Sequence, residues 1–172
     1  MDRTITRRGL LGGTGLLLAG CGFRPLHAPP AEVGADVQAE LAAIRVGMMP
    51  NRRGQMMRQI LQGRLERPGT AARYELRVAV LPGSSLQGYR RDGSPSRVSL
   101  NYTAPWSLVT LAVPPVMVAS GTARAFDDYN IPDNEFFAGL QSADAADRRL
   151  LEQIADDIVL RLTLTFRERP AA

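Results

Sequence analysis

The sequence predicts an α+β fold, a two-layer sandwich in which two helices cover one face of a four-stranded, mostly antiparallel sheet. Three segments in the middle of the 172-residue chain alternate apolar with polar residues, as half-buried strands do. One segment near the C-terminus has apolar residues at helical spacing instead. These apolar residues are Ala146, Leu150, Leu151, Ile154, Ile158, Val159, Leu162 and Phe166.

The first elements of the predicted domain are a short strand and a helix. The apolar run 41–49 suits a buried strand, and Pro50 ends it. Asn51 is a good N-cap for the helix that follows, and Pro68 and Gly69 end that helix. Its apolar residues at helical spacing are Met56, Met57, Ile60, Leu61 and Leu65.

Three strands of a meander come next. Residues 74–80 alternate as a strand, 82–95 are expected to be a loop, and 97–108 alternate as a second strand. After a turn at Pro114 and Pro115, residues 116–126 predict the third strand. One face of that strand would let a helix lie close, because it carries Met117, Ala119, Gly121, Ala123 and Ala125.

The closing helix completes the order strand, helix, three strands, helix. Ser142 is a candidate N-cap for it, with an earlier start near Asp133 as the alternative. The sequence contains no internal repeat.

The first twenty residues have the pattern of a secretory signal. Three arginines precede an apolar run over 9–19, and the small residue Gly20 stands before Cys21. The run is about half of the roughly 20 residues that a membrane-spanning helix needs. We therefore expect residues 1–20 to be a signal peptide, 21–36 a flexible tether, 37–167 the folded domain and 168–172 a C-terminal tail.

Composition limits the possible partners and cofactors. Removal of residues 1–20 takes away three of the 21 arginines and one of the 17 acidic side chains, so the expected mature chain has a net charge of only +2. This near balance argues against a nucleic-acid partner. The chain has no lysine, and its one cysteine permits no intramolecular disulfide.

Catalytic chemistry is hard to build from these residues, and we expect neither an enzyme nor a cofactor nor a metal site. The single histidine, His27, lies in the expected tether, where no acid can orient it. Two pairs of adjacent aspartates, 127–128 and 156–157, point to different faces of their elements and suit solvated charges better than a metal site.

The residues Leu18-Ala19-Gly20-Cys21 resemble the lipobox of bacterial lipoproteins. That resemblance implies that the sulfur of Cys21 carries lipid and that Cys21 becomes the N-terminus. A buried free cysteine is the alternative. The segment 6–11 also resembles a twin-arginine export signal, so either export route remains open.

Along its mature length the chain resembles the LptE family of lipopolysaccharide-assembly lipoproteins. The resemblance rests on the order and spacing of four segments, 21–26 (CGFRPL), 53–58 (RGQMMR) with Leu61, 121–124 (GTAR) with Tyr129 and Asn130, and 145–162. It implies an outer-membrane lipoprotein that plugs the large β-barrel LptD and helps to place lipopolysaccharide in the outer leaflet. An accessory lipoprotein of another envelope machine, such as barrel assembly, and a twin-arginine-exported cofactor protein are the alternatives.

Five arginines are candidates for contact with the phosphates and acidic sugars of lipopolysaccharide, because guanidinium groups bind such anions as charge-assisted pairs. Strand parity places three of them on the polar side of the sheet, and the other two lie in the expected loop. The alternative is a solvated face or ion pairs with Glu75 and Asp92. The five candidates are Arg77, Arg90, Arg91, Arg97 and Arg124.

Overall fold

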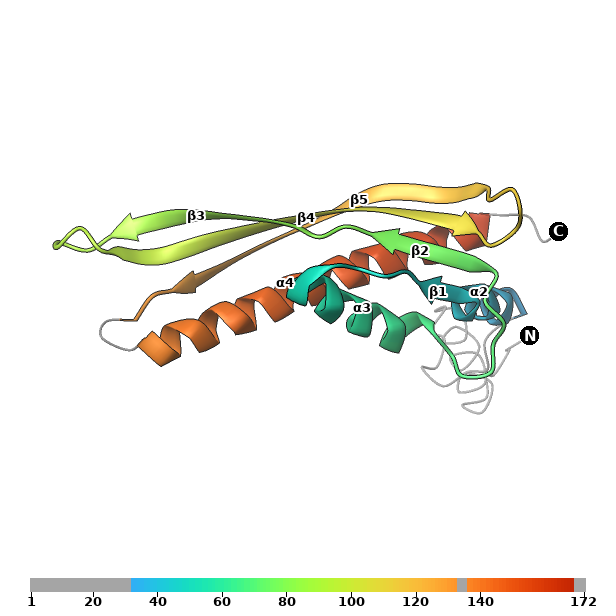
Figure 1. Ribbon diagram of the computed structural model, residues 1–172, viewed down its shortest axis with the longest axis horizontal. Helices are drawn as coiled ribbons and strands as arrows, with labels where there is room; N and C mark the ends of the chain where they lie inside the picture. The colour runs from blue at the N-terminus through green and yellow to red at the C-terminus, as the bar shows by residue number, and fades with distance from the viewer. Residues whose placement is uncertain (1–31, 133–135, 169–172) are drawn as a thin grey trace, which may run out of the picture. The chain divides into compact units, whose positions relative to one another are not determined.

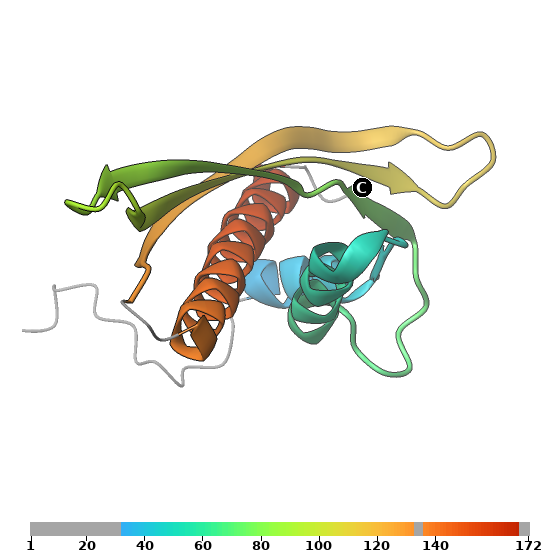
Figure 2. The ribbon, with the colours of Figure 1, turned by 60° about the vertical axis from the view of Figure 1, so that its left-hand side comes forward.

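A computed structural model describes residues 32–132 and 136–168. Five strands form one layer and three helices lie on one face of it in this part of the chain (Figures 1 and 2). In chain order these elements are α2 (Glu32–Ala42), β1 (Ile44–Val46), α3 (Asn51–Leu65), β2 (Tyr74–Val78), β3 (Leu81–Tyr89), β4 (Pro95–Thr110), β5 (Met117–Asn130) and α4 (Phe136–Glu168). The predicted two-layer α+β fold is confirmed, with one more strand and one more helix than expected.

The sheet is built around β4. β5 runs antiparallel along one side of it, whereas β2 and β3 share the other side. β2 pairs with residues 106–110 of β4 and β3 with residues 95–103. The two strands therefore occupy the same position in the sheet, one after the other, and are separated by Ala79 and Val80. Among the strands of the described residues, only β1 is parallel to its neighbour, β2. The sheet is therefore mostly antiparallel, as predicted.

The core lies between the inward face of the sheet and the helices. Alternate residues of β4 are buried there, and α4 supplies the facing apolar stripe. The buried β4 residues are Val98, Leu100, Tyr102, Ala104, Trp106 and Leu108. Those of α4 include Leu150, Leu151, Ile154, Ile158 and Leu162.

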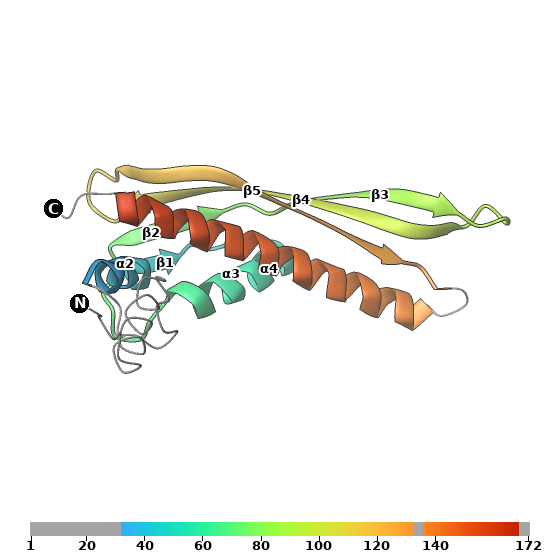
Figure 3. The same cartoon turned by 180° about the vertical axis from the view of Figure 1, so that it is seen from behind.

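β5 presents small residues to this core, as the sequence predicts. Ala123 and Ala125 are buried, and α4 packs against β5 (Figure 3). Gly121 faces the ring of Trp106, and a Cβ atom at position 121 would lie only 3.0 Å from Trp106 Cζ2. The large indole thus fits because its neighbour on β5 has no side chain.

Gly121→Val is expected to lower the free energy of unfolding by about 1–3 kcal/mol, because its methyl groups would overpack the Trp106 ring. Urea unfolding followed by circular dichroism measures this change. Ser120→Val is the matched control, because Ser120 is exposed on the opposite face of β5. Equal unfolding free energies for the two variants would contradict the packing described.

β3 was not predicted, and the expectation of a loop over 82–95 is wrong for residues 82–89 and for Pro95, the first residue of β4. Pro82, Gly83 and Gly88 interrupt any apolar alternation, and nearly all of β3 is exposed. Its strand structure rests instead on backbone pairing with β4, which sequence periodicity does not report. Residues 90–94 alone form the turn between the two strands.

α2 was also not predicted. It occupies the end of the expected tether and the start of the expected strand over 41–49, which shrinks to the three residues of β1. Val37 and Leu41 of α2 are buried in the core, and α2 contacts α4. Helix α2 thus starts at Glu32, within the stretch 21–36 that was expected to be a tether.

The N-termini of α3 and α4 differ from those predicted with Asn51 and Ser142 as N-caps. Pro50 is the N-cap of α3, without a side-chain cap, and Asn51 adopts a φ of 63°. Asn tolerates this left-handed conformation better than most residues, so Asn51 turns the chain rather than capping the helix. α4 includes Phe136, which confirms a start earlier than Ser142.

Candidate functional site

The outward face of the sheet carries three of the five candidate arginines. Arg77 on β2, Arg97 on β4 and Arg124 on β5 are all exposed, and each is next to at least one buried residue of its strand. The parity prediction for these three residues is confirmed.

The register shows that these arginines are spread along the sheet. Arg124 pairs with Thr103 of β4, six residues from Arg97, which corresponds to about 20 Å along the strand. Arg77 pairs with Ser107 on the other side of β4, four residues beyond Thr103. A ligand would have to be large to contact all three.

Two of the three arginines are ion-paired. Arg77 Nη2 lies 2.8 Å from Glu75 Oε2, and Arg45 approaches the other oxygen of Glu75 at 3.0 Å. Hydrogen bonds from these guanidinium groups, led by Arg77, lower the pKa of Glu75. Arg97 Nη2 lies 2.8 Å from Asp128 Oδ2, and hydrogen bonds from Ser99 and Arg97 lower the pKa of Asp128.

Arg90 is a structural residue of the β3–β4 turn. Its guanidinium donates to the carbonyl oxygens of Pro95, at 2.9 Å, and of Ile131. It therefore ties the turn to the segment that follows β5. Asp92 accepts hydrogen bonds from Ser94, at 3.0 Å from its amide and 2.8 Å from its hydroxyl, and these bonds lower the pKa of Asp92.

Arg91 and Arg124 are the two candidates without an ion-pair partner among the described residues. Arg91 is exposed in the turn at one end of the sheet, whereas Arg124 is exposed in the middle of β5. Leu81 pairs with Thr103 from the other side, and Phe126 is 67% exposed two residues from Arg124. Arg124 thus lies beside exposed apolar side chains, a combination common in contact surfaces.

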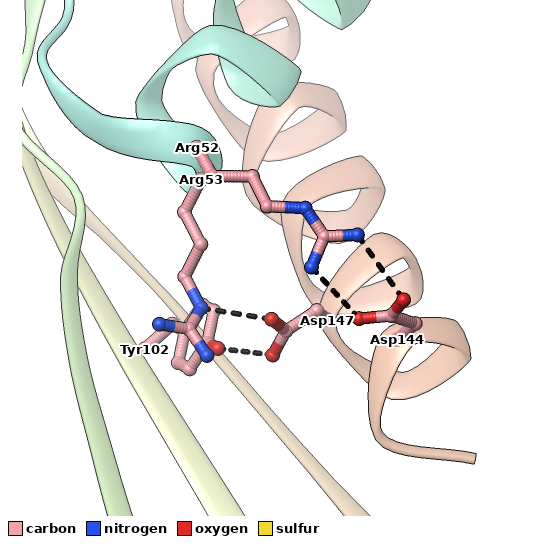
Figure 4. A network of polar contacts seen from close by, with 5 residues as sticks. All are labelled: Arg52, Arg53, Tyr102, Asp144 and Asp147. Carbon is pink, nitrogen blue, oxygen red and sulfur yellow. Dashed lines mark hydrogen bonds and ion pairs between the residues drawn. The ribbon is translucent and has the colours of Figure 1, made fainter. Parts of the chain in front are cut away.

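A second polar feature lies on the opposite face of the sheet, where α3, α4 and β4 meet (Figure 4). Asp147 of α4 is only 8% exposed. Its Oδ2 accepts a 2.8 Å hydrogen bond from Arg53 Nε, and its Oδ1 accepts one from the Tyr102 hydroxyl. Burial and the nearby carboxylate raise the pKa of Tyr102, so its hydroxyl stays protonated and donates.

An adjoining ion pair lies closer to solvent. Arg52 holds Asp144 with two parallel hydrogen bonds of 3.0 and 3.1 Å, which lower the pKa of Asp144. Both pairs border a cleft of about 500 Å³. Its apolar wall comprises Val78, Val80, Leu81, Pro82, Leu100 and Tyr129. Each of these two arginines is already paired with a carboxylate of α4, and Asp147 is bonded to Tyr102 of β4. The network therefore joins α3 to α4 and to the sheet.

Sequence reasoning missed this network, although one signal pointed to it. Asp147 lies between Ala146 and Leu150, within the apolar stripe of α4. A carboxylate in such a stripe needs a buried partner. The identity of the partners, Arg53 and Tyr102, depends on which strand and helix pack there, and this cannot be read from one sequence.

Cys21 and His27 lie outside the described residues. Within residues 32–132 and 136–168, no group of three His, Cys, Asp or Glu side chains is placed to hold a metal ion. In the same part of the chain no helix is both long and apolar enough to cross a membrane.

Comparison with known proteins gives the family and supports the fold. No curated protein matches the chain. A lipoprotein structure from Caulobacter crescentus has a TM-score of 0.63 at 22% identity, covering 78% of this chain and 98% of its own. The structure of rare lipoprotein B from Shewanella oneidensis has a TM-score of 0.53 at 16% identity, covering 71% of this chain and 94% of its own. The structure of a minor lipoprotein from Acinetobacter baumannii has a TM-score of 0.55 at 16% identity, covering 72% of this chain and 92% of its own.

These structural similarities concern the fold alone. The family match, in contrast, is made by the sequence itself. Residues 41–162 match the LptE family, described as lipopolysaccharide-assembly. This range includes β1 to β5, α3 and most of α4. The chain therefore belongs to the LptE family of lipopolysaccharide-assembly lipoproteins.

Proposed function

We propose that this chain is an outer-membrane lipoprotein that binds and plugs an LptD-like β-barrel and assists the assembly of lipopolysaccharide into the outer leaflet. Lipid on Cys21 would hold it at the periplasmic side of the outer membrane. The observation that carries the proposal is the match to the LptE family over residues 41–162. The lipobox-like residues 18–21 supply the anchor.

The outward face of the sheet suits a barrel partner. A large outer-membrane barrel has a polar interior. Along β4 the outward residues include Ser99, Asn101, Thr103 and Ser107. The charges of Arg77 and Arg97 are balanced by neighbouring carboxylates. Apart from Arg124, which has no carboxylate partner among the described residues, such a face can enter a polar lumen without burying unpaired charge.

Direct contact with lipopolysaccharide would fall first to Arg91 and Arg124. Arginine recognises phosphate with two parallel hydrogen bonds, and these two guanidinium groups have no competing carboxylate among the described residues. Arg77 and Arg97 would have to exchange an existing ion pair for the ligand, which reduces their net contribution. Arg90 would act by holding the turn in place.

Arg124→Gln is expected to weaken binding of purified lipopolysaccharide about fivefold, because loss of one charge-assisted hydrogen bond costs roughly 1 kcal/mol or more. Arg91→Gln is expected to have a similar effect. Fluorescence titration at low salt measures both. Arg161→Gln is the control for lost charge, because Arg161 lies on α4 and pairs with Asp157 at 2.9 Å. Unchanged affinity in both test variants would remove direct contact by these residues.

Affinity purification of the tagged chain from detergent-solubilised outer membranes tests the partner. We expect a large β-barrel protein in about equal amount, as one plug in one barrel requires. Mass spectrometry identifies what is retained. Recovery of a different envelope machine, or of the lipoprotein alone, would refute the proposed partnership while leaving the family and fold unchanged.

A further inference from the structure

The turn between β4 and β5, together with Met117 at the start of β5, is apolar and exposed. Residues 111–117 (LAVPPVM) contain no charged and no hydrogen-bonding side chain. Val113 is 97% exposed, Met117 63% and Val116 58%. A continuous exposed apolar segment of this kind marks a contact site for a membrane or for another protein.

The turn is held in shape by hydrogen bonds that its backbone amides donate. The amide of Thr110 donates to Val116 O at 2.9 Å, and the amide of Val116 donates to Thr110 Oγ1 at 2.9 Å. The amide of Leu111 donates to Arg73 O, also at 2.9 Å. Because the apolar side chains are already positioned, their burial would require little additional ordering.

The residues between Cys21 and the start of α2 are numerous enough for the proposed lipid anchor to reach this turn. Arg73, which accepts from Leu111, also donates its amide to Ala43 O at 2.8 Å, directly after α2. α2 has 11 residues and is about 16 Å long. The 11 peptide units between Cys21 and Glu32 can extend over at most about 36–40 Å. The lipid of Cys21 and the turn can therefore meet the same bilayer surface.

We propose that the 111–117 turn inserts its apolar side chains into the membrane leaflet that holds the lipid of Cys21. This inference rests on the lipid anchor of the proposed function. A polar barrel lumen is a poor environment for the turn. Its few side chains also offer much less than the roughly 1,000 Å² that a stable contact between two copies buries. Arg73 beside the turn is already paired with Glu40 at 2.8 Å, so the apolar side chains and not this charge would carry the contact with the leaflet.

The test uses the full lipidated chain in vesicles of phosphatidylethanolamine and phosphatidylglycerol. Val113→Cys carries an environment-sensitive fluorophore, and Gln87→Cys on the exposed β3 is the matched control. We expect blue-shifted emission and strong quenching by lipids with a spin label in the acyl chain at position 113, and neither change at position 87. Val116→Asp added to Val113→Cys should abolish both changes, because a charge in the turn opposes insertion.

Three other results would overturn the inference. Equal quenching at positions 113 and 87 would show no specific insertion. A blue shift that needs no vesicles and grows with protein concentration would show that a second copy covers the turn. A blue shift that needs the co-purified barrel would assign the turn to that partner. Reaction of the fluorophore with Cys21 in the chain without an added cysteine is a separate result. It would show a free thiol and so refute the proposed lipid anchor itself.

Discussion

Asp147→Ala is expected to lower the free energy of unfolding by about 2–4 kcal/mol. The substitution leaves the buried Tyr102 hydroxyl without its acceptor, which alone costs roughly 1–3 kcal/mol, and it breaks the pair with Arg53. A gain in helix propensity of up to about 0.7 kcal/mol from Ala offsets only part of this loss. Chemical denaturation followed by circular dichroism measures the change.

Two further variants separate the contributions within this network. Tyr102→Phe removes the hydroxyl and leaves the Arg53–Asp147 pair, so we expect a smaller loss, about 1 kcal/mol. The double variant Tyr102→Phe with Asp147→Ala should be less destabilised than the sum of the single variants, because the two side chains share one hydrogen bond. Strict additivity would contradict the contact between Tyr102 and Asp147.

Ile158→Ala is expected to destabilise the domain by about 2–5 kcal/mol, the range for truncation of a fully buried aliphatic side chain. Ile158 is 0% exposed in the middle of the apolar stripe of α4. A domain of this size has a total stability of roughly 5–15 kcal/mol, so this one change removes a large share of it.

The same helix supplies the control for Ile158. Leu160 is 58% exposed, and Leu160→Ala should alter the free energy of unfolding by no more than about 0.5 kcal/mol. Thermal and urea unfolding of the two variants in parallel measure the difference. Similar losses for both would mean that the helix does not bury the face described.

The elements with a one-sided apolar pattern were predictable from the sequence. The stripe of α4, the alternation in β2 and β4 and the small inward residues of β5 all describe contacts with one core. The parity of Arg77, Arg97 and Arg124 follows from the same alternation. Periodicity is informative there because each element has one buried face.

The remaining features depend on tertiary contacts that leave no period in the sequence. β3 is held by backbone pairing to β4 and buries almost nothing, so its residues show no alternation. α2 buries only Val37 and Leu41 among the residues from 36 onwards, too few to mark a helix in an Ala-rich stretch. The separation of the arginines along β4 required the register, and the ion pairs with Glu75 and Asp128 required the strand neighbours.

The central proposal, assistance in lipopolysaccharide assembly, is tested most directly by depleting the protein from its own cells. The rate at which newly made, radiolabelled lipopolysaccharide becomes accessible to a surface-modifying enzyme is then measured. We expect this rate to fall while lipopolysaccharide accumulates at internal membranes, and expression of the intact chain should restore it. An unchanged rate after complete depletion would contradict the proposal.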